Sequence, residues 1–208
     1  MQIEMLALGH IGANFYVLYE LGAEQCIVVD PGDEPDVAIA KLNGLGLAPA
    51  YILITHGHPD HVGGVAGLKK AFPDAIVMMH EGDSGHMGSR SFRYRDGAAS
   101  EVAAIDRFYQ DGDLVSCGDI QLRVIHTPGH SPGGVCLYEE KEACLFSGDT
   151  LFQASIGRSD LPGGNYAELA SSIRNRLYTL PPETVVYPGH DVATSIGNEM
   201  RGNPHVRA

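Results

Sequence analysis

Seven potential metal ligands, gathered in four short stretches, constrain this chain more than any other feature. The first stretch is Thr-His-Gly-His-Pro-Asp-His, and it holds four of them: His56, His58, Asp60 and His61. The other three each follow a glycine: His130, Asp149 and His190. Imidazole nitrogens and carboxylate oxygens are donors that zinc and similar divalent ions prefer. Seven donors exceed what one tetrahedral ion takes and suit two ions that share a ligand, so we expect a chain folded around a metal centre.

The first stretch is expected to lie between a strand and a helix. The apolar run 51–54 predicts a buried strand, and residues 62–72 predict a helix. His56 and His58 are two apart in an extended loop, so both can face one point. Asp60 and His61 stand at the helix entrance and point elsewhere. One short motif is therefore able to serve two neighbouring ions.

Strands and helices alternate in both halves of the 208-residue chain, whose length fits one domain over residues 1–208. Helices are predicted from about Pro35 to Leu45, over residues 165–180 and after a last strand at 184–187. Further β-rich runs lie at 2–8, 14–20, 25–29, 75–79, 114–116, 119–126, 133–139 and 143–147. This order favours an α+β fold, with two sheets packed face to face and helices on both outer faces. The metal ligands would then lie at strand ends, along one edge.

Composition excludes several classes of partner. A net charge of −12 argues against nucleic acid and against an anionic membrane surface. The sequence holds neither a signal-peptide pattern at its start nor an apolar run of about 18 residues that would span a membrane. None of the four cysteines forms a Cys-x-x-Cys pair, which favours reduced thiols and a cytoplasmic location. These cysteines are Cys26, Cys117, Cys136 and Cys144.

The metal motifs are similar to those of metallo-β-lactamase-fold hydrolases, and within that superfamily the chain resembles the glyoxalase II (hydroxyacylglutathione hydrolase) group. The similar stretches span nearly the whole chain: 14–18, 30–32, 55–64, 126–133, 147–152, 157–160 and 187–190. The resemblance implies a four-layer αβ/βα sandwich of two mixed sheets. Full-length glyoxalase II proteins add a C-terminal helical domain that supplies much of the glutathione site. This chain ends at Ala208 and resembles the short single-domain members, which have no separate C-terminal helical substrate domain.

The resemblance also implies a role for each ligand. His56, His58 and His130 would bind one ion, and Asp60, His61 and His190 the other. Asp149 would bridge the two ions, and Asp60 and Asp149 are the expected catalytic carboxylates. Asp30 would support the ligands by holding the loop.

We therefore expect a metal-dependent thioester hydrolase that cleaves acyl-glutathione or a related small anionic thioester. Two divalent ions lower the pKa of a shared water, so a metal-bridging hydroxide attacks the acyl carbon. Zn²⁺ is the expected metal, with Fe and Mn as alternatives.

Four arginines are candidates for substrate binding. Arg90, Arg93 and Arg95 lie within six residues and would pair with substrate carboxylates. The alternative is a solvated loop whose ion pairs are internal. Arg158, beside Asp160, is as consistent with a structural ion pair as with substrate contact.

Three other functions fit the same residues. A persulfide dioxygenase of this fold would hold one Fe(II) through His56, His130 and Asp149. A β-lactam or phosphodiester hydrolase would use both ions. A metal-binding protein without turnover is the third alternative.

Overall fold

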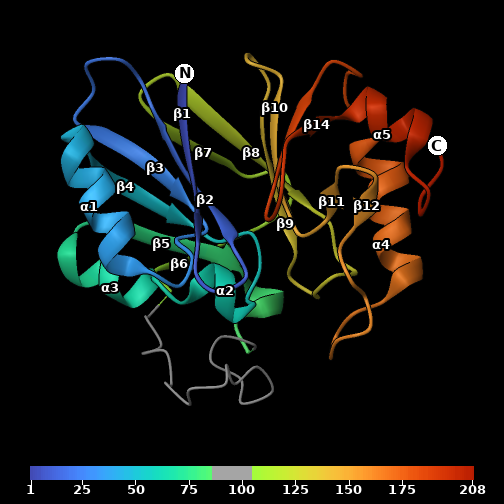
Figure 1. Ribbon diagram of the computed structural model, residues 1–208, viewed down its shortest axis with the longest axis horizontal. Helices are drawn as coiled ribbons and strands as arrows, with labels where there is room; N and C mark the ends of the chain where they lie inside the picture. The colour runs from blue at the N-terminus through green and yellow to red at the C-terminus, as the bar shows by residue number, and fades with distance from the viewer. Residues whose placement is uncertain (86–104) are drawn as a thin grey trace.

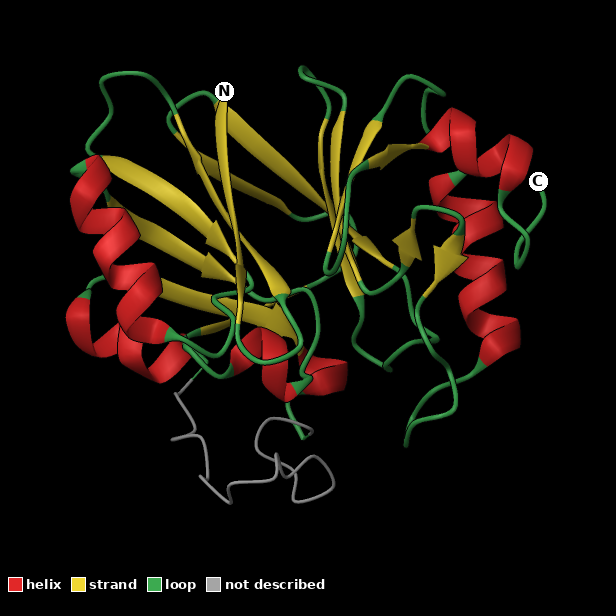
Figure 2. Ribbon diagram, viewed as in Figure 1, coloured by secondary structure: helices red, strands yellow, loops and turns green. Residues whose placement is uncertain are grey.

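Two mixed six-stranded sheets form the centre of the computed structural model, which describes residues 1–85 and 105–208 (Figures 1 and 2). The first sheet has the strand order β1-β2-β3-β4-β5-β6. Its strands are β1 (Gln2–Leu8), β2 (Ala13–Tyr19), β3 (Gln25–Val29), β4 (Ala48–Leu53), β5 (Ile76–His80) and β6 (Arg107–Tyr109). The first three pair antiparallel, and β3 to β6 pair parallel.

The second sheet has the order β14-β13-β10-β9-β8-β7. Its strands are β7 (Leu114–Cys117), β8 (Ile120–His126), β9 (Val135–Glu139), β10 (Cys144–Gly148), β13 (Val185–Pro188) and β14 (Thr194–Ser195). Only the pairing of β10 with β13 is parallel among these strands. A small hairpin of β11 (Leu151–Phe152) and β12 (Ser155–Ile156) lies beside it.

Helices cover the outer face of each sheet. Helices α1 (Pro35–Leu45) and α3 (Val65–Ala71) lie against the first sheet, and α4 (Tyr166–Ser172) and α5 (Ile196–Gly202) lie against the second (Figure 1). The expected four-layer sandwich of two mixed sheets is therefore confirmed. Among the helices of the described ranges, none is long and apolar enough to cross a membrane.

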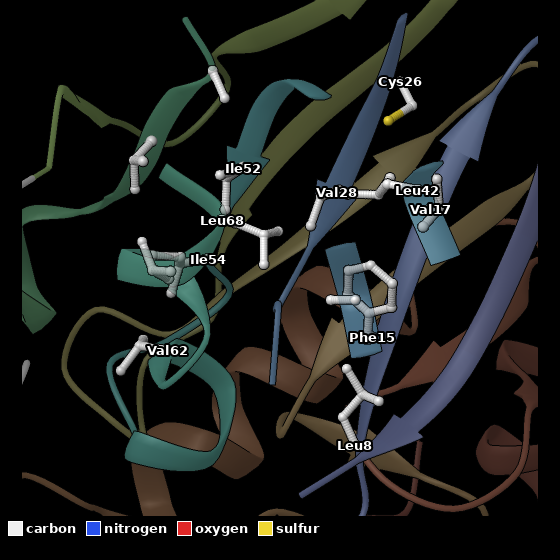
Figure 3. Close-up of a cluster of buried hydrophobic side chains, with 14 of the residues drawn as sticks. Leu8, Phe15, Val17, Cys26, Val28, Leu42, Ile52, Ile54, Val62 and Leu68 are labelled. Carbon is white, nitrogen blue, oxygen red and sulfur yellow. The ribbon is translucent and has the colours of Figure 1, made fainter. Parts of the chain in front are cut away.

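Three buried clusters hold the layers together. Strand β2 is buried on both faces: Phe15 and Val17 pack toward α1 and α3 (Figure 3), whereas Tyr16 and Leu18 pack between the sheets. The third cluster joins the second sheet to α4 and α5. The four cysteines are free thiols, and Cys26, Cys136 and Cys144 are buried.

The helices differ in detail from the sequence prediction. The helix expected over 62–72 is α3, which begins only at Val65, and a separate short helix, α2 (Pro59–Val62), precedes it. Gly63 and Gly64 lie between them, and the amide of Gly64 donates to the carbonyl of Gly32 rather than within a helix. A Cβ on Gly64 would lie 2.7 Å from the carbonyl oxygen of Pro31, so only glycine allows this approach. The segment expected over 165–180 is α4 followed by the π-helical η3 (Ile173–Leu177). The strand expected at 184–187 is β13, and the additional strand β14 follows it before α5.

Candidate metal centre

Five of the seven predicted ligands extend from loops at the ends of four strands, and Asp60 and His61 lie in the short helix α2. His56 and His58 follow β4 of the first sheet. His130, Asp149 and His190 follow β8, β10 and β13 of the second. The ligands therefore meet where the two sheets face each other, as the placement at strand ends predicts.

One group consists of three buried imidazoles, those of His56, His58 and His130, hereafter the three-imidazole group. One nitrogen of each lies within 4.8 Å of the other two. Nε2 of His130 lies 2.8 Å from Nδ1 of His58. This arrangement matches the three protein ligands of a zinc site with an open fourth position.

A second group consists of Asp60, His61 and His190, whose ligand atoms also lie within 4.8 Å of one another. Oδ2 of Asp60 is 3.2 Å from Nε2 of His61 and 3.1 Å from Nε2 of His190. The two imidazole nitrogens are 3.3 Å apart. One carboxylate and two histidines form a second set of three ligands.

Asp149 lies between the two groups. Its Oδ2 is 4.0 Å from Nε2 of His56 and 3.6 Å from Nε2 of His130 in the first group. The same oxygen is 3.7 Å from Nε2 of His190, and Oδ1 is 3.4 Å from Nε2 of His61. This carboxylate is therefore within reach of both groups.

Unpaired polar atoms show that the cluster suits a cation. Among the described residues, three buried side-chain atoms lack a hydrogen-bond partner. Two of them, Nε2 of His56 and Oδ1 of Asp149, belong to this cluster. Leaving such atoms unpaired costs about 1–3 kcal/mol each. A divalent ion would satisfy both atoms, so the residues present fit a metal centre.

The protonation states agree with this fit. Burial lowers the pKa of His56 well below its usual value and that of His58 to about 4, so both are neutral near pH 7. Burial would raise the pKa of Asp60 and Asp149, but the neighbouring histidines, His61 foremost, together outweigh burial and lower both pKa values. Burial likewise opposes protonation of His61, yet the carboxylates of Asp149 and Asp60 raise its pKa well above the usual value. The carboxylates around His61 therefore favour a positive charge at the second group, as a bound cation would supply.

Hydrogen bonds fix which nitrogen each histidine presents to the centre. Nδ1 of His130 donates to the carbonyl of Arg158 at 2.7 Å, and Nδ1 of His61 donates to Asp30 at 2.9 Å. Nδ1 of His56 lies 3.1 Å from Oγ1 of Thr55, which in turn donates to Asp30 at 2.6 Å. These contacts direct Nε2 of all three histidines toward the other ligands of the centre.

The His190 loop is held by residues whose role the sequence did not indicate. The side chains of Asn14 and Tyr16 both donate to the carbonyl of Pro188, at 3.0 and 2.6 Å. The Asn14 side chain also donates to the carbonyl of Asp191, at 3.0 Å. Strand β2 of the first sheet thus positions a ligand loop of the second. Asn14 and Tyr16 were visible in the sequence only as part of the family-like stretch 14–18.

The predicted substrate arginines have different outcomes. Arg90, Arg93 and Arg95 lie outside the described residues. Arg158 forms a two-pronged ion pair with Asp160, at 2.8 Å for both contacts, and both side chains are exposed. The backbone carbonyl of Arg158, rather than its side chain, contacts the candidate ligands, because it accepts the hydrogen bond from His130.

The chain belongs to the metallo-beta-lactamase superfamily, whose family model matches residues 9–190. It is 32% identical to the hydroxyacylglutathione hydrolase GloC of Haemophilus influenzae, over 100% of this chain and 99% of that one. The crystal structure of the B3 metallo-beta-lactamase BLEG-1 superposes with a TM-score of 0.92, at 37% identity and over 100% of both chains. A di-iron-bound form of TTHA1623 superposes with a TM-score of 0.85, at 38% identity, over 98% of this chain and 100% of that one.

Proposed function

We propose that this protein is a binuclear metal hydrolase that cleaves acyl-glutathione, such as S-lactoylglutathione, or a related small anionic thioester. The observation that carries the proposal is the position of Asp149 between two complete sets of three ligands. The three-imidazole group would hold one ion, and Asp60, His61 and His190 would hold the other. Asp149 would bind both. We further propose that residues 1–208 act as a single domain.

The residues of the site account for the chemistry. When bound, two divalent ions lower the pKa of a shared water, which supplies hydroxide near neutral pH. Asp60 and Asp149 remain ionised and offset only part of the metal charge, so the site attracts an anion in a protein of net charge −12. A thioester suits this site because its thiolate leaves without a strong acid to protonate it.

The choice of a thioester is supported by the similarity to GloC of Haemophilus influenzae, which covers the full chain. Zn²⁺ is our proposed metal, and the di-iron form of TTHA1623 makes iron the alternative to test. A screen of thioesters, read by release of free thiol, tests the proposal when the metal is quantified on the same sample. Chelator-treated protein is the control. Oxygen uptake with glutathione persulfide and no thioester cleavage would instead favour the dioxygenase.

β-Lactam hydrolysis is the second candidate, because the BLEG-1 B3 metallo-beta-lactamase is similar to this chain over its full length. Cleavage of a chromogenic β-lactam by the metal-loaded protein tests it directly. Turnover of the lactam that exceeds turnover of every thioester would replace our first proposal. The dioxygenase is less well supported, since one Fe(II) held by His56, His130 and Asp149 would leave Asp60, His61 and His190 unused.

A further inference from the structure

Asp83 is a buried carboxylate that contacts two of the ligand loops. It ends the short helix η1 (Glu81–Asp83), which follows β5, and its side chain is fully buried. Its Oδ2 accepts hydrogen bonds from the amide of Gly57 at 2.8 Å and from the hydroxyl of Ser131 at 2.7 Å. Its Oδ1 accepts one from the amide of Gly133 at 2.6 Å.

These three donors flank the three-imidazole group. Gly57 stands between His56 and His58, and Ser131 directly follows His130. The first loop follows β4 of one sheet, and the second joins β8 to β9 of the other. A single carboxylate therefore connects the two loops that carry all three imidazoles.

The position of Asp83 is set by packing around it. A Cβ on Gly133 would lie 2.4 Å from the amide nitrogen of Asp83, so the two segments approach as closely as glycine allows. Beside this contact, the rings of His80 and His126 stack, with centroids 4.1 Å apart and planes 12° apart. The η1 turn thus packs against the His130 loop. This packing holds the Asp83 carboxylate in position to bind both ligand loops.

We propose that Asp83 is a positioning residue for the three-imidazole group, an inference that rests on the metal centre proposed above. Partners that orient metal ligands change metal affinity by roughly 10–100-fold when removed. Asp83→Asn keeps the shape but turns an amide N–H₂ toward groups that themselves donate. The effect should be selective, because Asp60, His61 and His190 are supported by Asp30 and Asn14 instead.

Paired backgrounds make this selectivity measurable. The His190→Ala variant breaks the Asp60, His61 and His190 group and leaves the three-imidazole group intact. The His130→Ala variant does the reverse. Zinc affinity is measured by competition with a chromogenic chelator, with and without Asp83→Asn. We expect a loss of roughly 10–100-fold in the His190→Ala background and none in the His130→Ala background.

Asp106→Asn is the matched control. The Asp106 carboxylate also accepts a backbone hydrogen bond, from Val77 at 2.9 Å, and pairs with Lys69 at 2.8 Å, and neither partner belongs to a ligand loop. It should leave zinc affinity unchanged in both backgrounds. Equal losses in both backgrounds with Asp83→Asn, or no loss in either, would overturn the positioning role.

A second variant serves if Asp83→Asn does not fold. Ser131→Ala removes the hydrogen bond from the Ser131 hydroxyl and keeps the carboxylate, so it should give a smaller loss in the His190→Ala background alone. Unchanged affinity there would overturn the role of Asp83. Failure of the parent His190→Ala protein to bind zinc would instead refute the three-imidazole site, and with it the proposed function.

Discussion

Asp30 and His61 form a buried pair in which Oδ2 of the carboxylate lies 2.9 Å from Nδ1 of the imidazole. Because the carboxylate accepts a hydrogen bond from Nδ1, the other ring nitrogen of His61, Nε2, faces Asp60 and His190. Asp30 also accepts the amide and hydroxyl hydrogens of Thr55, whose oxygen contacts His56. One carboxylate thus orients a histidine in each ligand group. The backbone of Asp30 has a φ of 48°, in the left-handed region that residues other than glycine seldom adopt.

Replacing Asp30 with Asn should weaken metal binding at both groups. The amide cannot accept from Thr55 and His61 at every position that the carboxylate serves, so both histidines lose orientation. We expect zinc affinity to fall roughly 10–100-fold, measured by chelator competition. Asp36→Asn, an exposed position in the first turn of α1, is the control. Wild-type affinity in Asp30→Asn protein would show that this pair does not support the centre.

Gly189→Ala should damage the site through steric contact alone. A Cβ at this position would lie 2.3 Å from Oδ1 of Asp149 and 2.8 Å from Cε1 of His61. We expect reduced zinc content and a lower melting temperature. Gly44→Ala in α1 is the matched control, because nothing lies within 4 Å of its added Cβ. That change should stabilise the protein by about 0.5–1 kcal/mol. Full zinc content in Gly189→Ala protein would contradict the geometry of the centre.

Asp149→Ala should be more damaging than Asp60→Ala. Asp149 lies within 4.0 Å of histidines from both groups, whereas the carboxylate of Asp60 contacts His61 and His190 of its own group. We expect Asp149→Ala to lose both ions and nearly all turnover, and Asp60→Ala to keep one ion. Metal content and thioester hydrolysis are measured for both variants. Retention of both metals and near-normal turnover in Asp149→Ala would refute its bridging role.

Changing Arg90, Arg93 and Arg95 together to Ser tests the predicted substrate contacts. If they pair with substrate carboxylates, KM for an anionic thioester should rise at low salt, and the difference should shrink as salt increases. Each exposed contact contributes about 0.2–1 kcal/mol. Arg201→Ser on α5 is the control. An unchanged KM at low salt would show that these arginines have no role in substrate binding.

The fold was predictable because local pattern and burial agree. The run 51–54 predicted the end of β4, and the ligands beside glycines predicted loops at strand ends. Separation of the helix over 62–72 into α2 and α3 was not predictable. At the break the amide of Gly64 donates to the carbonyl of Gly32, a contact between segments distant in sequence.

The supporting residues of the centre were only partly predictable, for the same reason. Asp30 was expected to hold its loop, and it accepts hydrogen bonds from Thr55 and His61. The contact of Asn14 with Pro188 spans 174 positions in the chain, and no local pattern indicates it. Asp83 had one signal, a carboxylate just after a strand, but its partners lie on two other loops.

The metal content of protein purified without chelator tests the binuclear centre most directly. Elemental analysis should give about two ions per chain when metal is ample, and the same sample should hydrolyse a thioester. The two sets of three ligands around Asp149 are the reason for this expectation. A stable value near one ion per chain, unchanged by added zinc, iron or manganese, would contradict it.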